Sequence, residues 1–266
     1  MKIISFTQTK EYLHFYAHPL GETPLPHMEQ ICDNLQKGLT LIAARPRMGA
    51  STFALSLALH IAKRGSNVLY CAHRQQQIPC ILDRYRKSEP DPDTLKDIPF
   101  FYAEMFYPRT FDDFRAVMWN YRSDMRLDYI FVDCLQDFEV DERFCVNQSF
   151  EEYLCKNLRQ LSYELCLPII ATTHLNRRPE YRSGIEGKIP QLGDLRGGDL
   201  ALYATQIYFP YRPAYYHIYY DDKTGEDIRD QMYIFANGGA SGLNDEFRFT
   251  FDHMGGRVTE VDNHEL

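Results

Sequence analysis

The sequence lacks the features of a membrane-spanning or disulfide-stabilised protein. No apolar run approaches the ~18–20 residues that a membrane-spanning helix needs, and the first residues do not combine a basic segment with a long apolar core. The seven cysteines are odd in number and contain no C-x-x-C pair. We therefore expect reduced, buried thiols in a cytoplasmic protein without a membrane partner or a signal peptide.

The sequence also lacks an excess of basic residues. The 29 Lys and Arg residues against 37 Asp and Glu residues give a formal net charge of −8, which argues against a generally basic nucleic-acid-binding protein. A local basic patch remains compatible with this balance, because charges act over roughly 8–10 Å in physiological salt. With 266 residues, 44% of them hydrophobic, the chain can bury the core of one large domain.

Short apolar runs alternate with helical patterns from Gly38 onward. Four runs are apolar on both faces, at residues 39–44, 68–72, 129–132 and 168–172. Such runs are typical of strands in a parallel sheet with helices on both sides. The sequence Ser149-Phe-Glu-Glu152 has the pattern of a capping box that begins a helix.

The pattern changes after Gly193. Residues 215–220 and 231–236 flank the turn Asp222-Lys-Thr-Gly225 and predict an antiparallel hairpin, and residues 247–251 alternate as a further strand. The predicted fold class is therefore α/β, with a mostly parallel central sheet, flanking helices and added C-terminal antiparallel strands. We expect a lead-in segment over residues 1–37 with one short helix near 28–35, a main domain over 38–258, and a tail over 259–266.

Residues 39–58 have the layout of a phosphate-binding loop. A buried strand leads into the turn Arg45-Pro-Arg-Met-Gly49, and an almost entirely apolar helix follows. Such loops bind phosphates through backbone N–H groups at the helix N-terminus and through a lysine, while a Ser or Thr hydroxyl holds magnesium. The turn glycine and the hydroxyl of Ser51 are present, but Ala50 stands where the lysine belongs.

A second nucleotide motif lies at residues 129–133. This hydrophobic strand ends in Asp133, and an aspartate in that position can hold a magnesium-bound water beside the loop hydroxyl. We expect that any bound nucleotide is ATP or ADP, with magnesium on Ser51 and Asp133. The predicted nucleotide-binding residues are Arg45, Arg47, Met48, Gly49, Ala50, Ser51, Thr52 and Asp133.

Several segments, in matching order and spacing, resemble motifs of DnaB-type replicative helicases. Residues 43–49 (AARPRMG) resemble the "ARPSMG" loop of that family, and residues 128–136 (DYIFVDCLQ) resemble its "IDYLQ" strand. Residues 158–171 match the helix and strand that follow. The segments THLNR (173–177) and DLR (194–196) resemble "SQLNR" and "DLR". The resemblance implies a RecA-like P-loop NTPase fold, the C-terminal motor domain of the family, without a counterpart of its helical N-terminal domain.

The departures from the family pattern all concern hydrolysis. The loop lysine of the family falls on Ala50, its catalytic glutamate on His73, and its switch glutamine on His174. The "KQRNG" segment, which supplies a lysine and an arginine finger to the neighbouring subunit, aligns with Ile234-Phe-Ala-Asn-Gly238. Because an arginine finger alone is worth about 10³–10⁵ in rate, these losses predict a pseudo-ATPase without catalytic residues of its own.

The resemblance also implies partners. Family loops between "SQLNR" and "DLR" track single-stranded DNA, and the corresponding stretch here contains basic and aromatic side chains that can contact phosphates or stack on a base. The predicted DNA-binding residues are Arg177, Arg178, Tyr181, Arg182 and Lys188. Active relatives form rings, partly through a linker helix that docks on the next subunit, so we expect a homo-oligomer and replication proteins as partners. Asp194 and Arg196 are expected to tie a loop to the helix below it.

The leading hypothesis is a hydrolysis-deficient, DnaB-like protein that binds nucleotide, DNA or a partner as an accessory factor of replication or of a mobile element. Two alternatives stay open. One is an active ATP-dependent DNA helicase or ATPase with displaced catalytic groups, for which Arg47 is a candidate replacement cation. The other is an interaction module whose nucleotide cleft is empty.

Overall fold

The computed structural model describes residues 2–5, 26–72, 77–88, 95, 97–105, 110–140, 149–237 and 245–261. Ten strands of this part form one sheet in the order β1-β4-β3-β5-β6-β2-β7-β8-β9-β10. The strands are β1 (Lys2–Ser5), β2 (Gly38–Ala44), β3 (Val68–Ala72), β4 (Phe100–Glu104), β5 (Tyr129–Asp133), β6 (Pro168–His174), β7 (Ala204–Tyr211), β8 (Gln231–Asn237), β9 (Glu246–Asp252) and β10 (Arg257–Glu260).

The middle of the sheet is parallel and both edges are antiparallel. Strands β4, β3, β5, β6, β2 and β7 pair in parallel, whereas β1 pairs antiparallel with β4 at one edge. Beyond β7, the C-terminal strands β8, β9 and β10 add three antiparallel pairings. The fold class predicted from the sequence is confirmed.

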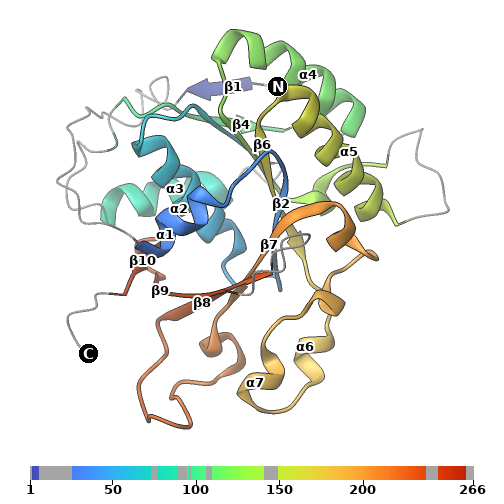
Figure 1. Cartoon of the computed structure of the whole chain (residues 1–266). Helices are drawn as coiled ribbons and strands as arrows, with labels where there is room; N and C mark the ends of the chain where they lie inside the picture. Colours follow the sequence, from blue (N-terminus) through green and yellow to red (C-terminus); the bar gives the residue numbers. More distant parts are fainter. Residues whose placement is uncertain are drawn as a thin grey trace.

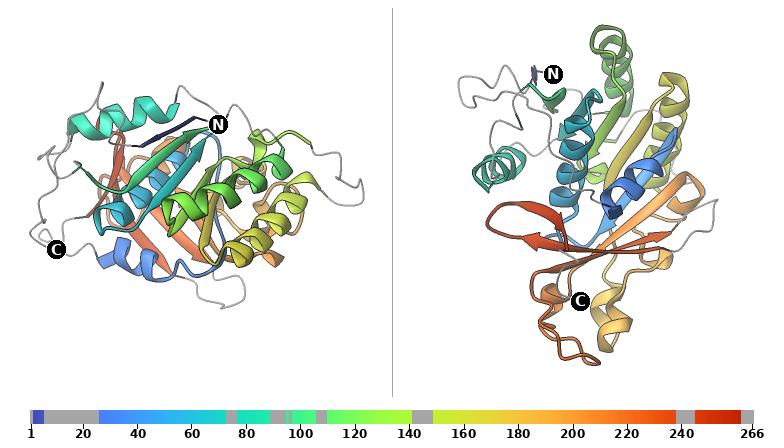
Figure 2. Two further views of the ribbon diagram at one scale, coloured as in Figure 1. Left: turned by 90° about the horizontal axis from the view of Figure 1, so that it is seen from above. Right: turned by 60° about the vertical axis from the view of Figure 1, so that its left-hand side comes forward.

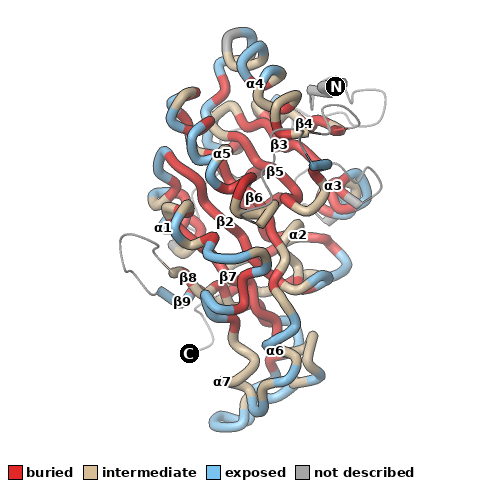
Figure 3. The backbone as a smooth tube through the Cα atoms, turned by 90° about the vertical axis from the view of Figure 1, so that its right-hand side faces the viewer, coloured by how far each residue is buried: buried red, intermediate tan, exposed pale blue. Residues whose placement is uncertain are grey.

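Helices cover both faces of the sheet (Figures 1 and 2). Helices α1 (Pro26–Asp33), α2 (Ala50–Lys63) and α3 (Gln77–Ser88) share one hydrophobic core with β10, and α4 (Phe111–Met125) and α5 (Phe150–Leu165) lie in the other core. Every residue of β2 and β3 is buried, which explains why these strands are apolar without alternation. The tube in Figure 3 shows this continuous buried centre.

The predicted capping box is present at the start of α5. The Ser149 hydroxyl accepts a hydrogen bond from the Glu152 N–H at 3.0 Å, and the Glu152 carboxylate accepts one from the Ser149 N–H at 3.3 Å. Both otherwise unpaired donors of the first helical turn are thereby satisfied. This cap fixes where α5 begins.

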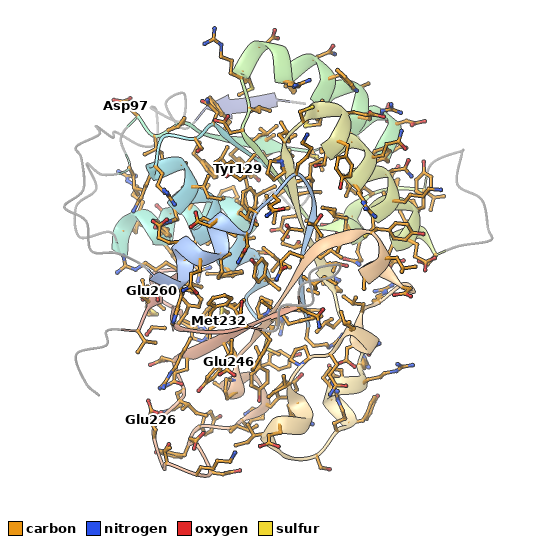
Figure 4. All side chains as sticks on the ribbon, in the orientation of Figure 1. Asp97, Tyr129, Glu226, Met232, Glu246 and Glu260 are labelled. Carbon is orange, nitrogen blue, oxygen red and sulfur yellow. The ribbon has the colours of Figure 1, made fainter. Side chains whose placement is uncertain are left out.

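Helix α1 packs on its own domain. Met28, Ile31 and Leu35 are buried in the core that contains α2, and the N–H of Met28 donates to Glu260 Oε1 at 2.8 Å. Figure 4 labels Glu260, at the end of β10. The helix expected near residues 28–35 therefore joins β10 and α2 in a single packing unit.

The prediction of a strand at residues 215–220 is wrong. Residues 213–216 form a 3₁₀ turn, and the strand that pairs with β8 is β7, at residues 204–211. Pro213 begins the turn, so the alternating tyrosines do not form a ladder. Pro210 argues against a strand when the sequence is read alone. The structure tolerates it because β7 pairs with β2 only as far as Tyr208, so the missing N–H of Pro210 leaves no bond to β2 unmade.

Ser162 joins α5 to the start of β2. Its buried hydroxyl accepts the Gly38 N–H at 2.8 Å and donates to the Leu167 carbonyl at 2.5 Å. We expect Ser162→Ala to lower the free energy of unfolding by about 1–3 kcal/mol, because it leaves buried polar groups unpaired. Chemical denaturation measures this change.

Lys156→Ala, on the exposed side of the same helix, is the control and should change the free energy of unfolding by less than about 0.5 kcal/mol. Equal stabilities of the two variants would contradict the structural role of Ser162.

Candidate functional site

A cavity of about 750 Å³ lies at the carboxyl ends of β2, β5 and β6, beside the N-terminus of α2. It brings together the two motifs that the sequence separates by about 80 residues, since Ser51 and Asp133 both line it. The carboxyl ends of parallel strands are the usual ligand-binding edge of such a sheet. We treat this cleft as the candidate functional site.

The loop at the start of α2 is held by packing against the C-terminal strands. Gly49 has φ 108°, and a Cβ atom placed on it would lie 2.6 Å from Met232 Cε and 2.8 Å from Phe251 Cε2. Met48 is buried, and its sulfur accepts the Arg212 N–H at 3.3 Å. Met232, labelled in Figure 4, belongs to β8. Strands β8 and β9 therefore shape the loop.

The predicted cations of the loop differ in availability. Arg45 donates from Nε to Glu180 Oε1 at 2.8 Å and from Nη1 to the Leu175 carbonyl at 2.8 Å, so its guanidinium ties the loop to the segment after β6. Arg47 is exposed with φ 69° and lines the cavity. Ala50, at the position of the family lysine, packs against the hydrophobic core.

Asp133 lines the cleft and is 9% exposed. Its Oδ2 atom accepts a hydrogen bond from the Tyr70 hydroxyl at 3.0 Å, and its Oδ1 atom accepts one from the Thr172 hydroxyl at 2.5 Å. Burial raises the pKa of Asp133, and the nearby hydroxyls of Thr172, Ser51 and Tyr70 oppose that shift.

Tyr70 was not predicted from the sequence, because it lies inside the apolar run of β3. Its ring is fully buried and stacks on Phe131 with 5.7 Å between ring centroids and 12° between planes. Burial, followed by the charge of Asp133, raises the pKa of Tyr70 well above its usual value. The phenol therefore stays protonated and remains a hydrogen-bond donor to Asp133.

Arg212 is a second residue that sequence reasoning missed. It follows β7 and is buried, with its guanidinium 3.9 Å from the centroid of the Phe251 ring and one nitrogen against His253. Its Nε has no hydrogen-bond partner among the described residues. Burial lowers the pKa of Arg212 and, together with the Arg212 charge, the pKa of His253. An arginine directly after a long apolar run was the available signal.

The positions that the resemblance aligns with catalytic groups of the family are only partly described. His73 lies outside the described residues. His174 lines the cleft, and its N–H donates to Gln136 Oε1 at 3.2 Å. Ile234 and Ala236 are buried in β8. These two residues of the segment aligned with the arginine finger of the family therefore contribute to the hydrophobic core.

The predicted DNA-binding stretch forms α6 (Arg178–Tyr181) and α7 (Gly184–Lys188), which extend from the body of the domain (Figure 3). Arg178 donates to the Gly193 carbonyl at 3.0 Å and Lys188 to the Glu180 carbonyl at 2.7 Å. Tyr181 is 79% exposed and Arg177 is exposed as well.

Asp194 and Arg196 hold this region in different ways. Buried Asp194 forms an ion pair with Arg182 of the same loop, and its carboxylate also accepts the Gln191 N–H at 2.8 Å. Arg196 forms an ion pair with Glu151 of α5, with 3.4 Å between Arg196 Nε and Glu151 Oε1. The expected tie to the helix below therefore comes from Arg196, while Arg182, predicted to bind DNA, is used within the loop.

The described residues contain neither a metal cluster nor a membrane span. No group of three or more His, Cys, Asp or Glu residues among them could hold a metal ion. In the same part of the chain, no helix is long and apolar enough to cross a membrane.

Comparison with known proteins places the chain in a family. The model of the DnaB-like helicase C-terminal domain matches residues 86–254. The chain belongs to this family. The resemblance inferred from the sequence motifs is thereby confirmed, although the loop at residues 45–51 lies outside the matched range.

Relatives of this DnaB-like domain include replicative helicases of several bacteria. DnaB of Geobacillus stearothermophilus is 26% identical over 223 residues, which cover 75% of this chain and 48% of that protein. DnaB of Buchnera aphidicola subsp. Baizongia pistaciae is 30% identical over 210 residues, which cover 70% of this chain and 44% of that protein. The chain thus spans less than half the length of these relatives.

Solved structures share the fold of this DnaB-like domain. One of them, an isolated ATPase domain, superposes with a TM-score of 0.71 at 20% identity, covering 90% of this chain and 92% of that one. A DnaB-like replicative helicase, described with its interactions with primase, gives a TM-score of 0.70 at 19% identity, covering 90% and 62%.

Gly49 offers a direct test of the packing that shapes the loop. Gly49→Ala combines a strained φ with close contacts to Met232 and Phe251, whereas Gly65→Ala has a similar φ of 90° and no described atom within 4 Å. We expect Gly49→Ala to lower the free energy of unfolding by about 1–3 kcal/mol more than Gly65→Ala does. Equal losses in thermal or chemical denaturation would contradict this packing.

Proposed function

We propose that this chain is a hydrolysis-deficient nucleotide-binding domain that acts as an accessory factor in DNA replication or of a mobile element. The observation that carries the proposal is the composition of the cleft. The Gly49 turn, Ser51 and Asp133 meet around one cavity, whereas Ala50 packs against the core where the family has its lysine.

Phosphoryl transfer requires positioned cations and an oriented water. Arg45 forms an ion pair with Glu180, so its guanidinium holds the loop in place and is not available to a transferring phosphate. The finger-aligned segment of β8 presents no cation among its described residues. Binding of phosphates at the α2 N-terminus depends on backbone N–H groups and the helix dipole, which the substitutions leave in place.

One observation favours the alternative of an active ATPase. Arg212 is a buried cation at the wall of the same cavity, and its Nε lacks a partner among the described residues. A guanidinium in this position has the charge and the donors that phosphate chemistry requires. The interaction module with an empty cleft is the remaining alternative, and nucleotide binding distinguishes it from the other two.

The proposal predicts nucleotide binding without turnover. ATP or ADP at ten to a hundred times Kd should stabilise the purified chain by about 1.4–2.7 kcal/mol, measured by thermal denaturation. Phosphate release from Mg-ATP should not exceed that of heat-inactivated protein, with or without single-stranded DNA.

Turnover that Asp133→Ala abolishes would support the active ATPase and contradict the proposal. The absence of any thermal shift at millimolar nucleotide would instead leave the interaction module.

We further propose that single-stranded DNA contacts the protein at Arg177 and Tyr181. Both side chains are exposed, whereas Arg182 and Lys188 form an ion pair and a hydrogen bond within the segment of residues 177–194. Arg177→Ala should weaken binding of a single-stranded oligonucleotide and reduce the slope of log K against log salt by about 0.7. Fluorescence anisotropy at several salt concentrations measures both quantities.

Lys156→Ala removes an equally exposed positive charge from α5 and should leave the slope unchanged. If both variants behave as the wild type, DNA binding does not involve this surface.

A further inference from the structure

Both oxygens of the Asp133 carboxylate already accept a hydrogen bond from the protein. A carboxylate offers about four lone-pair positions, and the hydroxyls of Tyr70 and Thr172 each donate to one oxygen of this carboxylate. Asp133 is also 9% exposed, so few water molecules can reach the remaining positions. The protein itself satisfies Asp133.

The proposed metal ligands therefore do not fit magnesium well. Mg²⁺ in nucleotide sites requires near-octahedral oxygen ligands, retains several waters and binds one or two carboxylates together with phosphates. Ser51 and Asp133 both line the cavity, but each oxygen of Asp133 already accepts a hydroxyl of the protein.

Arginines provide the positive charge that a metal ion would otherwise supply. Arg47, Arg84 and Arg212 line the same cavity. Arg84 donates to the carbonyl oxygens of Cys80 and His253, at 3.4 and 3.2 Å. None of these three arginines forms an ion pair with a carboxylate of another described residue. Guanidinium groups bind phosphate oxygens in a bidentate manner without a metal.

We propose that the cleft binds a nucleoside di- or triphosphate without magnesium, because Tyr70 and Thr172 occupy Asp133 while arginines neutralise the phosphates. The inference rests on the proposed function, namely that the cleft binds a nucleotide. Tyr70 acts as a positioning residue, since it touches Asp133 and stacks on Phe131.

The experiment measures ADP and ATP binding to the full chain by calorimetry, with millimolar Mg²⁺ and separately with EDTA. The two Kd values of the wild type should agree within about twofold. In Tyr70→Phe, which keeps the ring stacking but frees Asp133 Oδ2, added Mg²⁺ should tighten binding by about fivefold, the typical effect of one hydrogen bond. Thr172→Val frees Oδ1 and provides a second variant if Tyr70→Phe does not fold.

Tyr102→Phe is the matched control. Tyr102 pairs with Tyr70 across β3 and β4, and its buried hydroxyl has no hydrogen-bond partner among the described residues. Removing it should leave the response to Mg²⁺ as in the wild type.

The outcomes separate this inference from the proposed function. Wild-type binding that tightens tenfold or more with Mg²⁺ overturns the inference and leaves nucleotide binding established. A lack of binding in both conditions overturns the proposed function and the inference together. If Tyr70→Phe and Thr172→Val both fold and Mg²⁺ changes the Kd of neither, the hydrogen bonds to Asp133 are not what excludes the metal ion, and the inference is overturned.

Discussion

The burial of α2 on all sides is the constraint on which the rest of the structure depends. Its residues Thr52 to Leu59 are all buried, and the helix packs between the sheet, α1 and β10. A helix that is apolar all round must be covered everywhere. The C-terminal strands and α1 supply that cover, so segments that precede and follow the central strands both serve to enclose the helix after the phosphate loop.

This enclosure explains how the loop keeps its shape when the ligand chemistry changes. The turn at Gly49 is fixed by Met232 and Phe251, and the buried side chain of Met48 contacts the backbone of Arg212. None of these contacts involves a phosphate or a lysine. The loop geometry is therefore a property of hydrophobic packing, to which the Ala50 side chain contributes.

The sequence predicts those elements whose pattern is local. The four central strands, the capping box at Ser149 and the strand–turn–helix around Gly49 follow from apolar runs and turn residues. Strand β7 did not follow, because Pro210 argues against a strand unless its pairing partners are known. The contact of Tyr70 with Asp133 and the position of Arg212 at the cavity wall did not follow either. Each depends on which strands become neighbours, and a single apolar run does not specify that.

Several polar groups of the cleft region find partners inside the protein. Arg45 binds Glu180, Arg182 binds Asp194, and Asp133 accepts the hydroxyls of Tyr70 and Thr172. A buried polar group without a partner costs about 1–3 kcal/mol, so polar groups that line a cleft destabilise the protein unless they are paired. Internal satisfaction removes that cost. It also lowers the capacity of the same groups to rearrange around a bound phosphate.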